Sequence, residues 1–135
     1  MKRLLVIAGV AFSACCGASA PVLAQSANVQ TIVSIGGPPV TVVQNSPVNM
    51  AGVFEVGGST SATVVQNGNS NFTGILQFGG AANASVGQVG TNNFAFVGQS
   101  GQSTSSLLSQ FGSANLGSIT QFGGSNMSTV VQAGH

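Results

Sequence analysis

A repeat of eleven residues constrains this chain more than any other feature of its sequence. From Gln66 to Gln132 a glutamine recurs at every eleventh position without a miss, and a glycine follows each of them two places later. An aliphatic residue precedes each glutamine by two places, and a small residue precedes it by four. The frame continues backwards through Glu55 to Gln44. Internal periodicity of this kind is the sequence signature of a repeat architecture.

The position six before each glutamine shows that the true period is twice eleven. Asparagine occupies it in every second unit, whereas the residue in the units between them varies, so each repeat holds two similar halves. We divide the chain accordingly into repeats at residues 38–59, 60–81, 82–103 and 104–125, followed by a C-terminal half repeat at 126–135. The N-terminal segment, residues 25–37, carries a degenerate half repeat that lies one residue out of frame.

The pattern within each half predicts a β-strand. Residues at even offsets from the glutamine are restricted and those at odd offsets vary, which indicates a strand of about seven residues with one specified, inner face. Glycine and the two residues after it then form an arc. Two strands and two arcs return the chain over itself once per repeat. The predicted fold is therefore all-β: a repeat β-solenoid with two strand-arc units per 22-residue rung and amyloid-like parallel stacking at about 4.8 Å.

Stacking places like residues above like and defines three sets of candidate functional residues. A buried amide can donate to one neighbour and accept from the other, which gives a ladder of the cross-β type. The predicted inner ladder comprises Gln44, Glu55, Gln66, Gln77, Gln88, Gln99, Gln110, Gln121 and Gln132, with Asn49, Asn71, Asn93 and Asn115. The predicted arc glycines are Gly57, Gly68, Gly79, Gly90, Gly101, Gly112 and Gly123. The predicted outer apolar column comprises Met50, Phe72, Phe94 and Leu116. We interpret this column either as strand-forming residues on a sheet surface or as a contact site, since contiguous apolar surface in water marks an interaction.

The first 24 residues predict a secretory signal peptide, because a basic start precedes an apolar run and a small-residue cleavage site. We place the cleavage after Ala24, with Ala20 as an alternative, and a lipoprotein reading would instead use Cys15. The apolar run is too short to span a bilayer, so we expect no stable membrane insertion.

Residues 25–135 carry a single acid, Glu55, and no Lys, Arg or Cys. The lack of basic residues argues against nucleic-acid binding, which depends on Lys and Arg at the phosphates. One acid and the terminal His135 supply neither a catalytic pair nor a metal site, so we expect no enzyme, cofactor or metal. Because an inward carboxylate loses hydration, we expect the pKa of Glu55 to be raised.

The repeat resembles a known family. Residues from Gln66 to Gln77 and from Gln88 to Gln99 follow the pattern Gln-x-Gly-x-x-Asn-x-(Thr or Ala)-x-x-x-Gln, which is similar to the curlin repeat, and the similarity covers residues 38–134. Glu55 stands where that repeat has glutamine. The resemblance implies a secreted structural subunit that polymerises into curli-type amyloid fibres of the extracellular biofilm matrix and serves adhesion and aggregation at the cell surface, as a pilus does. Implied partners are another curlin subunit or nucleator, an outer-membrane curli secretion pore and accessory chaperones.

Two readings of the solenoid remain open. One is a polymerising subunit, a head-to-tail homopolymer in which the half repeats 28–36 and 126–134 combine into one rung shared by two molecules. The other is a monomeric solenoid that binds a flat surface such as ice or polysaccharide. The second reading requires a regular outward array, and only Thr41, Thr63 and Thr129 approach one.

Overall fold

The fold is a stack of parallel β-strands. The structure is a computed structural model and describes residues 11–15, 22–24, 29–35, 40–45 and 48–134. Parts of the predicted signal peptide, the ends of the degenerate half repeat and His135 lie outside these residues. The strands are β1 (Ala11–Cys15), β2 (Val22–Ala24), β3 (Val29–Ile35), β4 (Thr41–Asn45), β5 (Met50–Asn67), β6 (Phe72–Thr91), β7 (Phe94–Ser113) and β8 (Leu116–Ala133).

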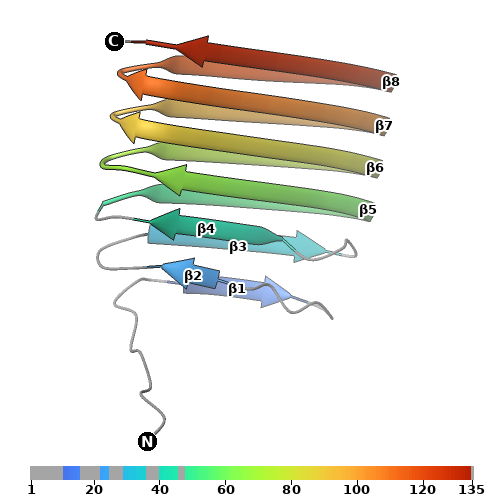
Figure 1. The fold of residues 1–135 in the computed structure, drawn as a ribbon. Coiled ribbons are helices and arrows are strands. Elements are labelled where there is room, and N and C mark those ends of the chain that lie inside the picture. Colours follow the sequence, from blue (N-terminus) through green and yellow to red (C-terminus); the bar gives the residue numbers. More distant parts are fainter. Residues whose placement is uncertain (1–10, 16–21, 25–28, 36–39, 46–47, 135) are drawn as a thin grey trace, which may run out of the picture.

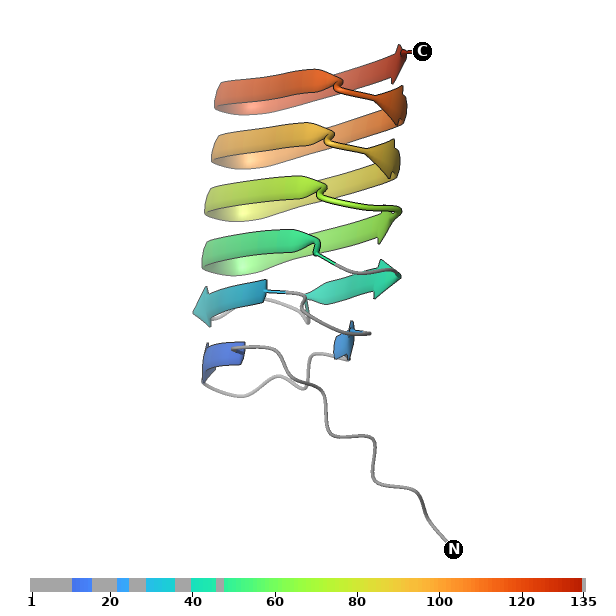
Figure 2. The same ribbon diagram turned by 90° about the vertical axis from the view of Figure 1, so that its left-hand side faces the viewer.

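Each strand from β5 to β8 forms one complete rung, and successive rungs lie directly above one another (Figure 1). All pairings are parallel, and from β5 onward each residue pairs with the one 22 positions later, so Gln66 lies beside Gln88 and Gln77 beside Gln99. Each rung doubles back on itself, which gives the stack the two layers seen in Figure 2. The predicted repeat β-solenoid is thereby confirmed.

A narrow core fills the space between the two layers. Its apolar part consists of the aliphatic residues two before each glutamine and the small residues four before it, including Val64, Val86, Val97 and Leu108. Alternate residues along β3 to β7 point inward and are buried, as a strand with one inner face requires. Apolar and amide columns therefore run side by side along the stack.

The strands are longer than the sequence predicts. We expected two strands of about seven residues per rung, yet β5 to β8 run for 18 to 20 residues and pass through the arcs at Gly57, Gly79, Gly101 and Gly123. Identical arcs are superposed, so the register pairs continue through these glycines and the backbone groups keep their partners. An interruption occurs only at the opposite arc.

Non-glycine residues with positive φ mark that opposite arc. They are Val48, Ser70, Asn92 and Ala114, at φ 57° to 64°, and each directly precedes the asparagine of its repeat. A non-glycine residue rarely adopts this left-handed conformation. Here backbone bonds to the rung below hold it, from Asn92 N to Asn69 O at 3.0 Å and from Ala114 N to Thr91 O at 3.0 Å.

Both ends of the repeat region are complete rungs. β3 and β4 together make one rung, because β3 pairs with the first half of β5 and β4 with its second half, while β8 spans both halves at the other end. The expectation that residues 28–36 and 126–134 are unpartnered half rungs is therefore wrong. The degenerate half joins the half that follows it, and the half from residue 126 joins the one before it.

The segment that we predict to be a signal peptide contributes two short strands below this stack. β1 pairs with β3 and β2 with β4. Cleavage after Ala24 stays a prediction, and it would remove both strands and leave the lower edges of β3 and β4 without these partners.

Candidate functional site

One glutamine ladder runs the length of the stack on the side of the second half repeats. Each Nε2 donates to the Oε1 of the glutamine in the next rung towards the C-terminus. The distances are 2.7 Å from Gln44 to Gln66, 2.8 Å from Gln66 to Gln88, 2.8 Å from Gln88 to Gln110 and 2.7 Å from Gln110 to Gln132. All but Gln132, which is half-buried, are buried. An unpaired buried amide would be costly, so the ladder stabilises only as a continuous chain of bonds.

Four of these five amides also bond to the opposite layer of their own rung. Nε2 of Gln66, Gln88, Gln110 and Gln132 donates to a main-chain carbonyl sixteen residues earlier, at 3.2, 3.0, 2.9 and 2.7 Å respectively. Both amide hydrogens of an interior glutamine are therefore used, one across the core and one along the stack.

The second ladder runs on the side of the Asn-type halves and contains an acid. Its members in register are Ser34, Glu55, Gln77, Gln99 and Gln121. Gln77 Nε2 donates to Gln99 Oε1 at 2.6 Å, and Gln99 Nε2 donates to Gln121 Oε1 at 2.9 Å.

Glu55 is fully buried at the lower end of this ladder. Desolvation raises the pKa of its carboxyl from 4.5 to about 7, against hydrogen bonds from Ser34 and Thr60 that lower the pKa. The two hydroxyls lie 3.4 and 3.5 Å from Oε2. A glutamine at this position would carry a donor, whereas an ionised carboxylate carries none.

The amide of Gln77 fits its site in two orientations, which suit different forms of Glu55. In the first, Nε2 is bonded to Gln99 and Oε1 faces Glu55 Oε1. In the reversed one, the nitrogen donates to Glu55 Oε1 at 2.7 Å, the oxygen accepts from Ala84 N at 3.0 Å, and that oxygen lies 2.6 Å from Gln99 Oε1. We infer that a protonated Glu55, which can donate to Gln77 Oε1, preserves the direction of the ladder, whereas an ionised one reverses Gln77 and sets two acceptors against each other.

The asparagine column has the predicted side-chain bond at its upper end, from Asn115 Nδ2 to Asn93 Oδ1 at 3.0 Å, and a main-chain bond that the sequence does not predict. Here the backbone N–H of each asparagine donates to the Oδ1 of the one in the rung below, at 3.0 Å for Asn71 on Asn49 and 3.1 Å for Asn93 on Asn71 and Asn115 on Asn93. The Nδ2 atoms of Asn71 and Asn93 donate to glycine carbonyls in the arc, at 3.0 and 3.1 Å. These asparagines therefore tie neighbouring rungs together directly after the residue with positive φ.

The arc glycines pack main chain against main chain. A Cβ on Gly57, Gly68, Gly79, Gly90, Gly101 or Gly112 would overlap the carbonyl oxygen of the glycine one rung above. Gly123, in the last rung, has no such neighbour and meets only Asn126 Nδ2, at 3.4 Å. Positive φ values at Gly68, Gly79, Gly90, Gly112 and Gly123 add a second reason for glycine.

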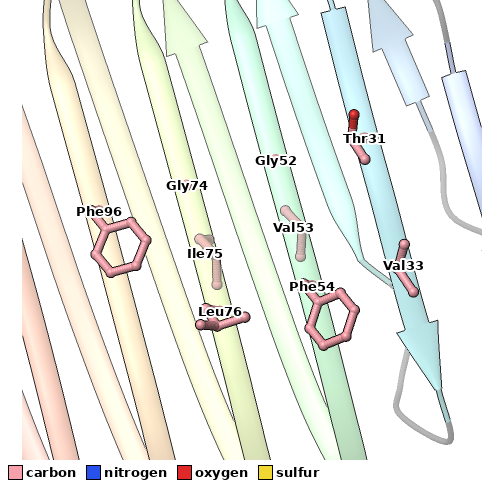
Figure 3. Close-up of a pocket in the computed structure, with 9 residues that line it drawn as sticks. All are labelled: Thr31, Val33, Gly52, Val53, Phe54, Gly74, Ile75, Leu76 and Phe96. Atoms are coloured by element: carbon pink, nitrogen blue, oxygen red, sulfur yellow. The ribbon is translucent and has the colours of Figure 1, made fainter.

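The outer apolar column lies on the surface of the Asn-type layer. Met50, Phe94 and Leu116 are exposed and Phe72 is half-exposed. The rings of Phe72 and Phe94 stack with centroids 4.8 Å apart and an interplanar angle of 6°. A shallow apolar groove of about 230 Å³ lies on the same face over Gly52 and Gly74, and the side chains at its rim are labelled in Figure 3. The outer face of the second layer has no continuous column of threonines among the described residues. Ser85 and Leu107 interrupt the column that contains Thr41, Thr63 and Thr129.

Sequence reasoning missed the polar groups four places before the ladder residues. Gln66 Nε2 donates to Thr73 Oγ1 at 3.0 Å, and Gln99 Nε2 donates to Ser106 Oγ at 2.8 Å. The repeat pattern groups these residues with alanine and glycine, because all of them are small. The signal that could have found them is their spacing, since each lies seven residues after a ladder glutamine.

The family model of the curlin associated repeat matches three times, at residues 57–90, 82–112 and 107–134. The chain belongs to the curlin family, whose members are structural amyloid subunits of extracellular fibres and not enzymes. Neither the curated proteins nor the solved structures contain a match to this chain.

The described part of the chain contains no helix with the length and apolar character that crossing a bilayer would demand. Nor does it bring together three or more His, Cys, Asp or Glu side chains as a metal site would.

Proposed function

We propose that this protein is exported, loses residues 1–24 and polymerises head to tail into an amyloid fibre of the extracellular matrix. The observation that carries the proposal is the open upper rung. Among the described residues β8 pairs with β7 alone, and Gln132 Nε2 has one acceptor where Gln88 and Gln110 have two and Gln66 has three. A second molecule that continues the 22-residue register would supply the missing acceptor.

Backbone chemistry supports the same function. A parallel strand with a free edge is a template for another chain, and proteins that avoid pairing protect such edges with charge, proline or a covering element. β8 has no charged residue and no proline. A contact between the top of one molecule and the bottom of the next joins two different surfaces and does not form a closed ring. Repeated addition of molecules therefore yields a fibre.

The test is assembly of purified residues 25–135. We expect thioflavin-positive fibres that grow without a second protein, that seed fresh monomer, and whose diffraction has a meridional spacing of about 4.8 Å. A protein that stays monomeric and folded at all concentrations would overturn the proposal and favour the surface-binding alternative.

Family membership supports a set of partners that we propose with it: a second curlin subunit or nucleator, the outer-membrane secretion pore and its chaperones. The outer apolar column and the adjoining groove are our candidates for lateral contact between fibres or with a nucleator, because contiguous exposed apolar surface favours association. Fibre bundling seen by electron microscopy would report on the lateral contact.

A further inference from the structure

The two outer faces of the stack differ in chemical character. The outer face of the Asn-type layer, which we call the apolar face, consists of the outward side chains of β3 and of the first halves of β5 to β8. Its only polar residues are Thr31, Ser100, Ser118 and Thr120. In the second layer every outward column of β4 and of the second halves of β5 to β8 contains Ser, Thr or Asn. The solenoid is therefore amphipathic across its two layers.

Aromatic residues concentrate on the apolar face. Every phenylalanine of residues 25–135 except Phe111 lies there, namely Phe54, Phe72, Phe78, Phe94, Phe96 and Phe122. The rings of Phe54 and Phe78 lie with centroids 5.7 Å apart, beside the stacked pair of Phe72 and Phe94. Phe78 and Phe94 are each 39% exposed. The one acid of residues 25–135, Glu55, is buried, so no charge opposes association of this face with a like face.

The relief of the apolar face suits a second sheet. A Cβ at Gly52 would meet nothing within 4 Å, and at Gly74 the nearest atom would be Phe96 Cδ2 at 3.1 Å. The groove over these glycines has Phe54, Leu76 and Phe96 at its rim (Figure 3). Sheets that pack face to face interdigitate their side chains. A face that carries both a groove and projecting side chains can therefore receive a second copy of itself.

The size of the apolar face determines when it can bind. Five strands at about 4.8 Å and about seven residues at about 3.3 Å give it an area of about 550 Å² per molecule. A stable interface buries about 800 Å² on each partner, so two single molecules would fall short. In a head-to-tail stack Val29 of the next molecule follows Leu116 and Ile35 follows Phe122, so the apolar face continues across each joint. The contacts of successive molecules then add.

We propose that two filaments of this chain pair through their apolar faces, and that this pair is the unit of the fibre. The partner is a second copy of the chain, and the contact is isologous, with the same surface on both sides. Pairing leaves the two more polar faces in water, so lateral growth ends at two filaments. The inference rests on the proposed polymerisation and deepens it, because it assigns the apolar face to a second filament.

Mass per length tests the pairing directly. Fibres of residues 25–135, measured by dark-field scanning transmission electron microscopy, should contain two molecules per rise of about 24 Å. Gly52→Lys places a charge in the groove, where pairing would desolvate it, so its fibres should contain one molecule per rise. Its elongation on seeds should stay within about twofold of the wild type. The added lysines lie about 24 Å apart along one filament, well beyond the screening length of about 8 Å in 0.15 M salt.

The matched control is Gly87→Lys, which adds the same charge to the outer face of the second layer. A Cβ at Gly87 would have only Ser109 Oγ nearby, at 4.0 Å, and neither Gly52 nor Gly87 has a positive φ. Fibres of Gly87→Lys should keep two molecules per rise.

Three results would overturn the pairing. They are wild-type fibres with one molecule or more than two per rise, Gly52→Lys fibres that keep two, and an equal loss in both variants. Single wild-type filaments would leave the apolar face to a different partner, such as a nucleator. If wild-type residues 25–135 form no fibres, the proposed function fails instead, so the two failures are distinguishable.

Discussion

The buried acid makes the sharpest prediction of the structure. Glu55→Gln replaces a fully buried carboxyl by an amide, the group that all three rungs above it have in this column. A pKa raised from 4.5 to about 7 means that the folded state binds the proton more tightly than the unfolded chain. The penalty on the folded state is absent below about pH 4.5, grows as pH rises through about 7, and reaches about 3 kcal/mol above that.

Seeded elongation followed by thioflavin fluorescence from pH 4.5 to 8, at constant ionic strength, measures this effect. We expect the wild type to elongate faster and to resist denaturant better at the acidic end, and Glu55→Gln to remove most of the dependence. As a control, adding Gln99→Glu to the Glu55→Gln variant moves the acid up the same ladder and should restore a pH dependence. A Glu55→Gln protein that keeps the wild-type profile would refute the reasoning.

Three further predictions concern the ladder, the arcs and the surface. Gln88→Ala removes one hydrogen-bond partner from each of the amides above and below it and should lower the free energy of unfolding in denaturant by about 1 to 3 kcal/mol, while the outward Ser100→Ala should change it little; equal losses would contradict the assigned faces. Gly79→Ala meets a carbonyl oxygen and a positive φ and should block folding into fibres, whereas Gly52→Ala, which has open space around its Cβ, should assemble normally by electron microscopy. Phe94→Ser should leave elongation on seeds within about twofold and reduce lateral bundling in micrographs, and unchanged bundling would remove the outer apolar column from the account.

The sequence was sufficient to predict which residues of each strand point inward or outward and how the rungs are in register. A period of two residues within a period of 22 is compatible with few other arrangements. Strand length was not accessible in the same way. Glycine predicts a bend but does not say whether the ladder of backbone bonds stops there, and that depends on whether identical arcs are superposed. The four non-glycine residues with positive φ carry no common side chain, since valine, serine, asparagine and alanine share no turn preference, and only the asparagine after them is periodic.

The candidate site divides along similar lines. The glutamine columns could be predicted because identical residues recur, whereas the bond of Gln30 Nε2 to Gln44 Oε1 across the core could not, because it occurs in a single rung. The error at the chain ends has a simple cause. Counting repeats from Pro38 leaves one half over at each end, but a coil has no preferred starting point, and pairing decides that β3 and β4 share a rung.

Solid-state NMR on fibres diluted with unlabelled protein tests most directly that each molecule forms its own stack of rungs. The contact to observe joins the side chains of Gln88 and Gln110, whose Nε2 and Oε1 atoms lie 2.8 Å apart in one molecule. We predict that the cross-peak between them survives tenfold dilution and that no contact arises between Gln88 of one molecule and Gln88 of another. Loss of the cross-peak on dilution, together with contacts between identical residues, would show that molecules stack flat upon one another and would contradict the solenoid as the unit of the fibre.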